Sequence, residues 1–581
     1  MKYECGLDIA ELEKRTSKDY LLTKKMLDVD AKEFLELADG DKKALSYLVK
    51  AARIIEKINM QLDSHHNLPF LKYLEEMCKK GDKKAQLTKI LFDAQKGIFA
   101  LDCESNLVKL AANLEKQQGR GLYPENLSKE EFHKILIQMI KDNKIKEVKK
   151  ILNQRSVVEY TKDKKELVAI DYIDKFQEDF KKIAELLLRA SCVSTCIEFN
   201  EYLRLQSQAF LVGDAMLDAY ADKKWAAMQD TPLEFTITRE NYSDEMTETV
   251  YENEELSKLL KENDIEVISK DYLGARVGIV NKEGTNYILK VKDYLPLMAR
   301  HMPYSDDYEQ VISDDSDISQ TMVDVDLIEV AGDVGAFRAG ITLAENLPNN
   351  DKLSLTIGGG RRNVYHRQIR FVTSEDAKQK IQEKLDNILE KEFHQYYDEN
   401  MDHPFTIGHE NGHSLGPKEG CEALGKYKSI IEENKADMVS LAMIDLLTEE
   451  GLYTEEERKK FIVTYAVDNM LKSKPELTQA HRVRSVMQNY YFIQNEAMKI
   501  SKEGFLSINI DRMVYIARQM LGEIIQVQLS KDFSVGEKYV LDNFVWTSEM
   551  ELVSQKLKKI SKRLNGKTEQ KLADKLFLEQ V

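Results

Sequence analysis

The amino-acid sequence predicts an α+β fold that is mostly α. In the first and last thirds of the chain apolar residues recur at intervals of three and four, the period of a helix with one buried face. The middle of the chain instead holds short runs rich in β-branched residues, separated by Gly, Asn and Asp, which is typical of strands and turns. With 581 residues the chain is long enough for two domains, or for two large lobes around a cleft.

The segments follow one another in a simple order. Residues 1–230 are predicted to be the helical N-terminal part of a mixed lobe, and its β-rich parts are expected at 231–288 and 323–376, in the runs LEFTI, ARVGIV, DLIEVAG, KLSLTI and VYHRQIRFV. Between these parts, residues 289–322 hold a helical excursion and the acidic stretch SDDYEQVISDDSD, a predicted solvated connector. Residues 377–581 return to the helical period and are predicted to form a second, helical lobe.

Composition excludes several classes of protein. The formal net charge is −16, and no Lys/Arg block outweighs its acidic neighbours, so no nucleic-acid partner is expected. The N-terminus lacks the apolar core of a signal peptide and no later stretch approaches 18 apolar residues, so no membrane association is expected. The six cysteines are sparse and show no CxxC pair, which predicts reduced thiols and a cytoplasmic location. The oligomeric state stays open.

The segment MDHPFTIGHENGHSLGP contains the pattern HExxH, formed by His409, Glu410 and His413. Two helical residues that are four apart lie on one face, so both imidazoles can bind one zinc ion. Glu410 would project beside the metal, where a general base can take a proton from bound water. The pattern also arises by chance, and Gly408 and Gly412 weaken the helix by propensity, so the assignment needs a third ligand.

That third ligand is predicted to be Glu433, twenty residues after His413. It lies in GKYKSIIEENKADMVSLAMIDLL, whose apolar residues follow a helical period, and this helix can pack against the first and present Glu433 to one zinc ion per chain. Asp437 is one turn further on the same face, where a carboxylate can accept the free ring N–H of a ligating histidine. The alternative is that Glu432, Glu433 and Asp437 form a solvated stripe with Lys435.

The two segments HENGHSLGP and IIEENKADMVSL resemble the paired signatures of the dipeptidyl peptidase III family of zinc metallopeptidases, a histidine motif and a Glu-Glu-x-x-Ala-Asp/Glu motif. The better-known members carry one extra residue between the histidines. The shorter HExxH form resembles plant and bacterial members that are sometimes joined to a Nudix domain, although no Nudix domain is evident in this sequence. The resemblance extends over roughly residues 119 to 500.

Three further segments imply roles for individual residues. FTITRENYSDEM resembles the stretch whose tyrosine stabilises the tetrahedral intermediate, which implies that role for Tyr242. LTQAHRVRSVMQNYY resembles the family's Ala-His segment, which implies that His481 also supports the transition state. DLIEVAGDVGAFRAGITLAENLPNND resembles the substrate-edge segment, which implies that Asn346 and Asn349 contact the peptide backbone.

Each of these residues also has an ordinary structural alternative. Tyr242 can be a loop-edge aromatic, because its segment diverges soon after the motif. His481 can be a helix-surface histidine, because the basic residues after it are one place out of register with the better-known members. Asn346 and Asn349 can belong to a plain turn around the proline between them. His403 precedes a proline outside the expected helix, and no role is assigned to it.

The resemblance implies a two-lobed fold, with zinc on the helical lobe, a small β-barrel or sheet in the mixed lobe, and a short peptide bound extended between the lobes. The expected reaction is peptide hydrolysis by a zinc-bound water that Glu410 activates, with Tyr242 and His481 as donors to the oxyanion. Release of N-terminal dipeptides rests on the resemblance alone. One alternative is a zinc hydrolase of the same fold that acts on another amide or on longer peptides. The other is a catalytically silent peptide-binding protein, which the complete set of metal and base residues disfavours.

Overall fold

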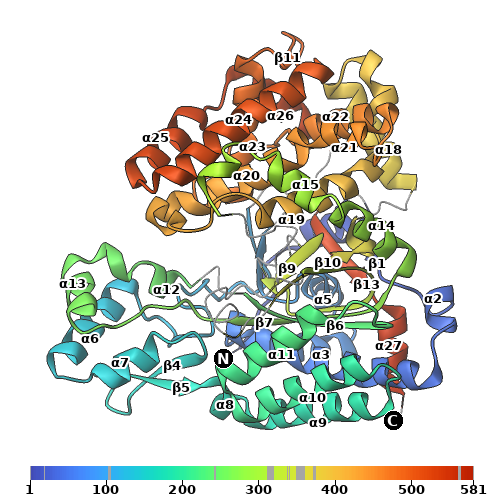
Figure 1. The fold of residues 1–581 in the computed structure, drawn as a ribbon. Helices are drawn as coiled ribbons and strands as arrows, with labels where there is room; N and C mark the ends of the chain where they lie inside the picture. Colours follow the sequence, from blue (N-terminus) through green and yellow to red (C-terminus); the bar gives the residue numbers. More distant parts are fainter. Residues whose placement is uncertain are drawn as a thin grey trace.

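The chain folds into two lobes, and a mostly helical architecture with one mixed sheet confirms the predicted fold class (Figure 1). The computed structural model describes residues 2–18, 20–101, 106–240, 244–309, 320–335, 338, 341–347, 357, 360–370, 375–560 and 564–579. The lower lobe in Figure 1 contains the sheet and both chain termini, and the upper lobe is built almost entirely of helices.

The N-terminal part of the lower lobe consists of helices with short strands between them. Its elements are α1 (Ile9–Thr16), β1 (Leu21–Lys25), α2 (Lys32–Leu35), α3 (Asp39–Asp63), α4 (Asn67–Lys79), α5 (Lys83–Gln95), β2 (Phe99–Leu101), β3 (Leu107–Lys109), α6 (Lys129–Lys141), α7 (Ile145–Ile151), β4 (Ser156–Tyr160), β5 (Leu167–Asp171), α8 (Tyr172–Lys175), α9 (Gln177–Val193), α10 (Ile197–Val212) and α11 (Ala215–Ala227). Ser128 caps the N-terminus of α6, where its side chain accepts a hydrogen bond from the Glu131 amide.

The central sheet is open and mixed, with the strand order β6-β7-β8-β10-β9. Its strands and the short helices around them are β6 (Leu233–Glu240), α12 (Glu245–Glu248), α13 (Glu254–Glu262), β7 (Tyr272–Val280), β8 (Gln320–Ala331), β9 (Ala344–Leu347), β10 (Arg361–His366) and α17 (Arg367–Arg370). All pairs are antiparallel except β8 and β10, which run parallel with Arg362 opposite Thr321. Among the described strands the sheet does not close into a barrel. Every residue of β7 is buried, and α3 packs against this strand.

The predicted strands agree with the sheet except at one place. LEFTI, ARVGIV and DLIEVAG lie in β6, β7 and β8, whereas 352–356 of KLSLTI fall outside the described residues. The prediction that VYHRQIRFV is a single strand is wrong, because β10 ends at His366 and 367–370 form a helical turn. The turn brings Gln368 onto β8, where it donates to Asp326 Oδ1 (2.8 Å) and accepts from the Leu327 amide (2.6 Å).

The upper lobe contains the remaining helices. They are α14 (Lys282–Lys292), α15 (Leu295–Arg300), α18 (Glu375–Ile388), α19 (Asp402–Ser414), α20 (Lys428–Ala442), α21 (Ile444–Glu449), α22 (Glu455–Asp468), α23 (Ala480–Gln494), α24 (Ile510–Ser530), α25 (Phe533–Asn543) and α26 (Ser548–Ile560), with a hairpin of β11 (Met498–Ile500) and β12 (Leu506–Ile508). Short 3-10 turns lie at Ser305–Asp307, Lys391–Tyr396, Glu399–Met401 and Cys421–Tyr427, and another lies in the lower lobe at Val250–Glu252. Helices α14 and α15 overlap the predicted helical excursion at 289–322, although α14 begins earlier, at Lys282, and they contribute Ile288 and Met298 to the upper core.

The chain returns to the lower lobe at its end. β13 (Leu564–Glu569) pairs in parallel with β1, and α27 (Lys571–Leu578) packs on α3 (Figure 1). Leu572 and Leu576 of α27 belong to the core of the lower lobe. The two lobes are therefore joined both near the sheet and through the C-terminal segment.

Within the described ranges, none of the helices combines the length and the apolar character that a membrane crossing requires.

Candidate metal centre

Helix α19 carries the HExxH motif and lies against α20 on the side of the upper lobe that faces the sheet (Figure 1). Its two glycines, which make the helix weak by propensity, permit this close packing. A Cβ on Gly408 would lie 2.2 Å from Ser440 Oγ, and one on Gly412 would lie 2.7 Å from the Ala436 carbonyl oxygen. Glycine is thus required at both positions because the backbones of α19 and α20 approach each other.

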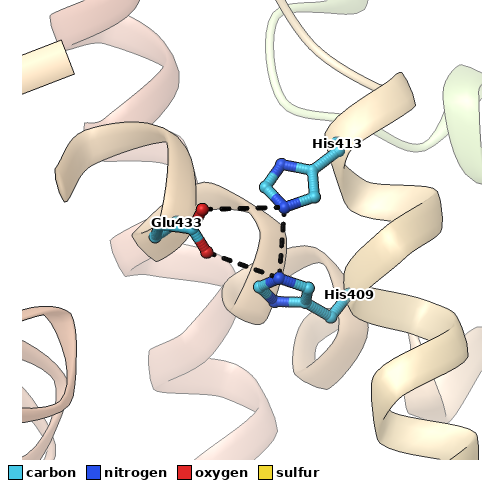
Figure 2. A group of neighbouring side chains, drawn as sticks. All are labelled: His409, His413 and Glu433. Atoms are coloured by element: carbon cyan, nitrogen blue, oxygen red, sulfur yellow. Dashed lines mark hydrogen bonds and ion pairs between the residues drawn. The ribbon is translucent and has the colours of Figure 1, made fainter. Parts of the chain in front are cut away.

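The structure brings His409, His413 and Glu433 together, with one potential ligand atom from each within 4.8 Å of the others. The two Nε2 atoms are 3.1 Å apart, and the Glu433 oxygens lie 3.4 Å from His409 Nε2 and 3.9 Å from His413 Nε2 (Figure 2). Figure 2 shows both imidazoles projecting from α19 toward the carboxylate on α20. Local helical spacing therefore produces the histidine pair, and helix packing supplies the carboxylate.

A second carboxylate stands behind each histidine. His409 Nδ1 lies 2.7 Å from Asp437 Oδ1, and His413 Nδ1 lies 3.2 Å from Glu432 Oε1. Each carboxylate accepts the Nδ1 proton of its histidine, so Nε2 is the ring nitrogen that can give up its proton and bind a metal.

These residues do not form a solvated stripe. Asp437 and Lys435 have no exposed side-chain surface, and the Glu433 side chain is 18% exposed. The polar face of α20 is therefore packed inside the lobe, and the alternative of a solvated stripe is wrong.

Other polar groups hold the two outer carboxylates in place. Arg484 Nη1 forms an ion pair with Asp437 Oδ2, and Gln488 Nε2 donates to the same oxygen at 3.1 Å. On the other side Lys435 Nζ donates to Glu432 Oε1 at 2.8 Å, and Gln528 Nε2 donates to Glu432 Oε2 at 3.0 Å. Lys435 also donates to the Leu415 carbonyl at 2.6 Å, which fixes the chain just after α19.

Charges on both sides of the site shift its pKa values strongly. Burial alone would raise the pKa of Glu433 and Glu432, but the histidines beside Glu433 and the lysines beside Glu432 hold both pKa values well below the usual range. Burial likewise opposes ionisation of Asp437, yet Arg484 and His409 lower its pKa. Burial lowers the pKa of Lys435 to about 8. The carboxylates are therefore ionised at neutral pH and available as ligands or acceptors.

The residues present fit a zinc ion. Burial disfavours the His409 imidazolium, but the hydrogen bonds to Asp437 and Glu433 outweigh it and raise the pKa of His409 to about 10 in the metal-free chain. Two imidazole nitrogens 3.1 Å apart beside a carboxylate need a shared proton or a cation between them. Tetrahedral ligands about 2.0 Å from a zinc ion lie about 3.3 Å from one another, which matches the spacing of this donor set. Two histidines and one glutamate leave the fourth position for water.

Of the other predicted site residues, the structure places Glu410 and His481 beside the three candidate ligands. Glu410 is half-buried next to His409, and its carboxylate forms no hydrogen bond or ion pair with the described residues, so it is available as a base. His481 on α23 is 70% exposed, with Nδ1 2.9 Å from Glu433 Oε2. Tyr242 and Asn349 lie outside the described residues. Asn346 falls in β9, paired with Asn363 of β10, and only its backbone is described.

The prediction that His403 lies outside the helix of the HExxH motif is wrong. His403 lies inside α19, which begins at Asp402, because Pro404 is tolerated in the first helical turn, where its nitrogen needs no partner. The His403 ring is buried between Tyr287 and Tyr365, with ring centroids 5.8 Å away in both cases. The residue belongs to the packing between α19, α14 and β10.

Sequence reasoning missed the partner of the second histidine and the groups behind both carboxylates. Glu432 directly precedes the predicted ligand Glu433. Because His413, like His409, needs an acceptor for its Nδ1 proton, Glu432 could have been identified from the sequence. Arg484 and Gln488 lie on α23, about 50 residues further along the chain, and no local spacing connects them to Asp437.

The fold and the site define a class of protein, a two-lobed, mostly helical protein with a two-histidine, one-glutamate centre on the helical lobe. Two solved structures have this fold. The structure of DPP III from Caldithrix abyssi matches with a TM-score of 0.77 over 96% of this chain and 98% of that chain, at 21% identity. The structure of dipeptidyl-peptidase III from Corallococcus sp. strain EGB matches with a TM-score of 0.74 over 98% and 99%, at 19% identity. At 21% and 19% sequence identity, the likeness to these two structures establishes the fold alone.

Among curated proteins, Nudix hydrolase 3 of Arabidopsis thaliana is 22% identical over 549 residues, which cover 85% of this chain and 66% of that protein. The chain therefore spans slightly less than two thirds of the length of this relative. No family model matches the chain.

Proposed function

We propose that this protein is a zinc-dependent peptidase that hydrolyses short peptides and releases N-terminal dipeptides. The observation that carries the proposal is the convergence of His409, His413 and Glu433, with an outer carboxylate behind each histidine. The fold shared with two dipeptidyl peptidase III structures supports the choice of peptides as substrates. Dipeptide release rests on those names and on the sequence resemblance, and the cytoplasmic location stays a prediction.

The chain's own residues divide the chemistry among them. When bound, zinc would lower the pKa of a water molecule and polarise the scissile carbonyl. Glu410, beside the first histidine and without a partner among the described residues, takes the proton from the attacking water and returns it to the leaving amine. His481 and Tyr242 donate hydrogen bonds to the developing oxyanion. Asn346 and Asn349 hold the peptide backbone at the edge of the sheet.

The place of His481 in the structure is consistent with this assignment. Its ring is largely exposed, which leaves it accessible to a substrate, while the 2.9 Å contact with Glu433 Oε2 keeps it beside the metal ligands. A donor in this position stabilises charge that appears only in the transition state, so its loss should lower kcat more than it changes KM.

The test compares metal content and turnover in matched variants. Wild type and the Glu410→Gln variant are expected to bind about one zinc per chain, because Glu410 is not a ligand. Glu410→Gln should lose about 100- to 10,000-fold in kcat on an N-terminal dipeptidyl arylamide, which is the contribution of a general base. Glu419→Gln, which changes a glutamate side chain that is 96% exposed, should keep both properties and serves as the control.

Each outcome separates the candidates. A Glu410→Gln enzyme that holds zinc and turns over at the wild-type rate contradicts the assigned base. Wild-type protein that binds zinc and peptide but cleaves neither dipeptidyl nor longer peptides is the silent peptide-binding protein. Cleavage of other amides but not of dipeptidyl substrates supports the alternative zinc hydrolase.

A further inference from the structure

Helix α23 presents a row of polar side chains to α20. His481, Arg484 and Gln488 are spaced by three and four residues, which places them on one face of the helix. His481 contacts Glu433, while Arg484 and Gln488 both contact Asp437. One face of α23 therefore reaches two carboxylates of the metal centre.

Arg484 and Gln488 use the same oxygen of Asp437. Both bind Oδ2, so that Oδ1 remains directed at His409 Nδ1, 2.7 Å away. Because the Asp437 side chain has no exposed surface, no bulk water competes for either oxygen. Rotation of this carboxylate would break the ion pair with Arg484, and this fixes the direction in which Asp437 accepts the histidine proton.

The amide of Gln488 is itself oriented from behind. Its Oε1 accepts hydrogen bonds from Tyr465 Oη (2.9 Å) and from Asn469 Nδ2 (3.0 Å), so its Nε2 must point toward Asp437 and Asn434. The network behind Asp437 is thus ordered by groups on α22, on α23 and just after α22. Such an outer layer determines where a metal-ligating ring points.

Stability alone does not account for the arginine. Its Nε atom is buried and has no hydrogen-bond partner among the described residues, which costs free energy. A buried ion pair is in general a weak source of stability, because desolvation offsets most of the attraction. A role in holding Asp437 explains why a positively charged side chain occupies position 484.

We propose that Arg484 is a positioning residue of the metal centre, which holds Asp437 so that His409 keeps its Nε2 lone pair directed at the metal. The inference rests on the proposed zinc function, and it assigns Arg484 an effect on zinc affinity that acts only through Asp437.

The test is a zinc dissociation constant measured on metal-free protein by competition with a chromophoric chelator. Arg484→Gln is expected to weaken zinc binding about tenfold, at the lower end of the range for outer-layer partners. Arg484→Lys keeps the charge and should restore most of the affinity. Arg482→Gln is the matched control, because the Arg482 guanidinium on the same helix binds Ser473 and Gln479 instead.

A double-mutant cycle with Asp437→Asn separates positioning from a general structural effect. If Arg484 acts through Asp437, Arg484→Gln changes zinc affinity little in the Asn background, whereas a structural role predicts the same loss in both backgrounds. If Arg484→Gln does not fold, the cycle is measured with Arg484→Met, which removes the charge but keeps most of the length of the side chain, and a loss of affinity only where Asp437 is present is the expected result.

Three outcomes are decisive, and they overturn two different statements. Equal zinc affinity for wild type, Arg484→Gln and Arg484→Lys, or equal losses in both backgrounds, overturns the positioning role and leaves the proposed function intact. Wild-type protein that binds no zinc overturns the proposed function itself.

Discussion

The contact between α19 and α20 leads to a quantitative prediction for Gly412→Ala. The new Cβ would lie 2.7 Å from the Ala436 carbonyl oxygen, about 0.7 Å closer than ordinary van der Waals contact, which begins at 3.4 Å. The Cα of Ala436 would be 2.9 Å away, so the obstacle is backbone that cannot rotate aside. We expect the two helices to separate by several tenths of an ångström, because close-packed interiors transmit such strain.

This displacement acts directly on the metal centre, because His413 follows Gly412 and Glu433 lies one turn before Ala436. Metal sites tolerate ligand shifts of only about 0.2 Å, so we expect zinc affinity to fall about 10- to 100-fold, as it does when an outer partner is lost. Overpacking should cost about 1–3 kcal/mol of the free energy of unfolding, against about 1 kcal/mol gained from the higher helix propensity of alanine. The net expectation is a loss of about 0–2 kcal/mol.

The matched control is Gly522→Ala in α24, where the added Cβ has nothing within 4 Å. It should keep its zinc affinity and gain up to about 1 kcal/mol from propensity. Urea unfolding of both metal-free proteins and zinc competition measure the two effects. A Gly412→Ala protein that matches Gly522→Ala in stability and wild type in zinc affinity would refute the argument that close helix packing positions the ligands.

Two further predictions concern the charges around the site. The pKa of His409 is raised to about 10 in the metal-free chain, so zinc must displace a proton, and we expect affinity to rise up to about tenfold per pH unit between pH 6 and 8. A dissociation constant that does not change with pH would contradict this. Glu432→Ala should weaken zinc binding about 10- to 100-fold, like Asp437→Ala, because each removes the hydrogen-bond acceptor of one candidate ligand histidine. A loss for Asp437→Ala alone would show that the His413 contact has no effect on the metal.

The three candidate metal ligands could be identified from the sequence because each lies at a recognisable place in a predicted helix. His409 and His413 are one helical turn apart and Glu433 lies on the next long helix, although only the packing of α20 on α19 brings Glu433 to the histidines. The outer groups could not be predicted, since Arg484 reaches Asp437 only when α23 packs on α20. Tertiary contacts between distant segments leave no periodic signal in one sequence.

The same division applies to the fold. Hydrophobic period predicted the helical ends of the chain and most strands of the middle section, but not the pairing of those strands. β8 and β10 are parallel neighbours although β9 separates them in sequence, and β13 pairs with β1 from the other end of the chain. At 367–370 the β-like composition predicted a strand, but the Gln368 contacts with β8 favour a turn.

The environment of α20 connects the fold to the proposed chemistry. This helix packs against α19, α23 and α24, and its residues from Asn434 to Ala442 are all buried, a pattern normally found in apolar core helices. Two of them, Lys435 and Asp437, carry charges, and buried ion pairs seldom repay their desolvation in stability. Replacing a buried ion pair by apolar residues of similar volume is often neutral or stabilising. The ion pairs of Lys435 with Glu432 and of Arg484 with Asp437 are therefore explained by their effect on the site, because they fix the carboxylates behind the two histidines. This arrangement lowers the stability of the lobe relative to apolar residues at the same positions.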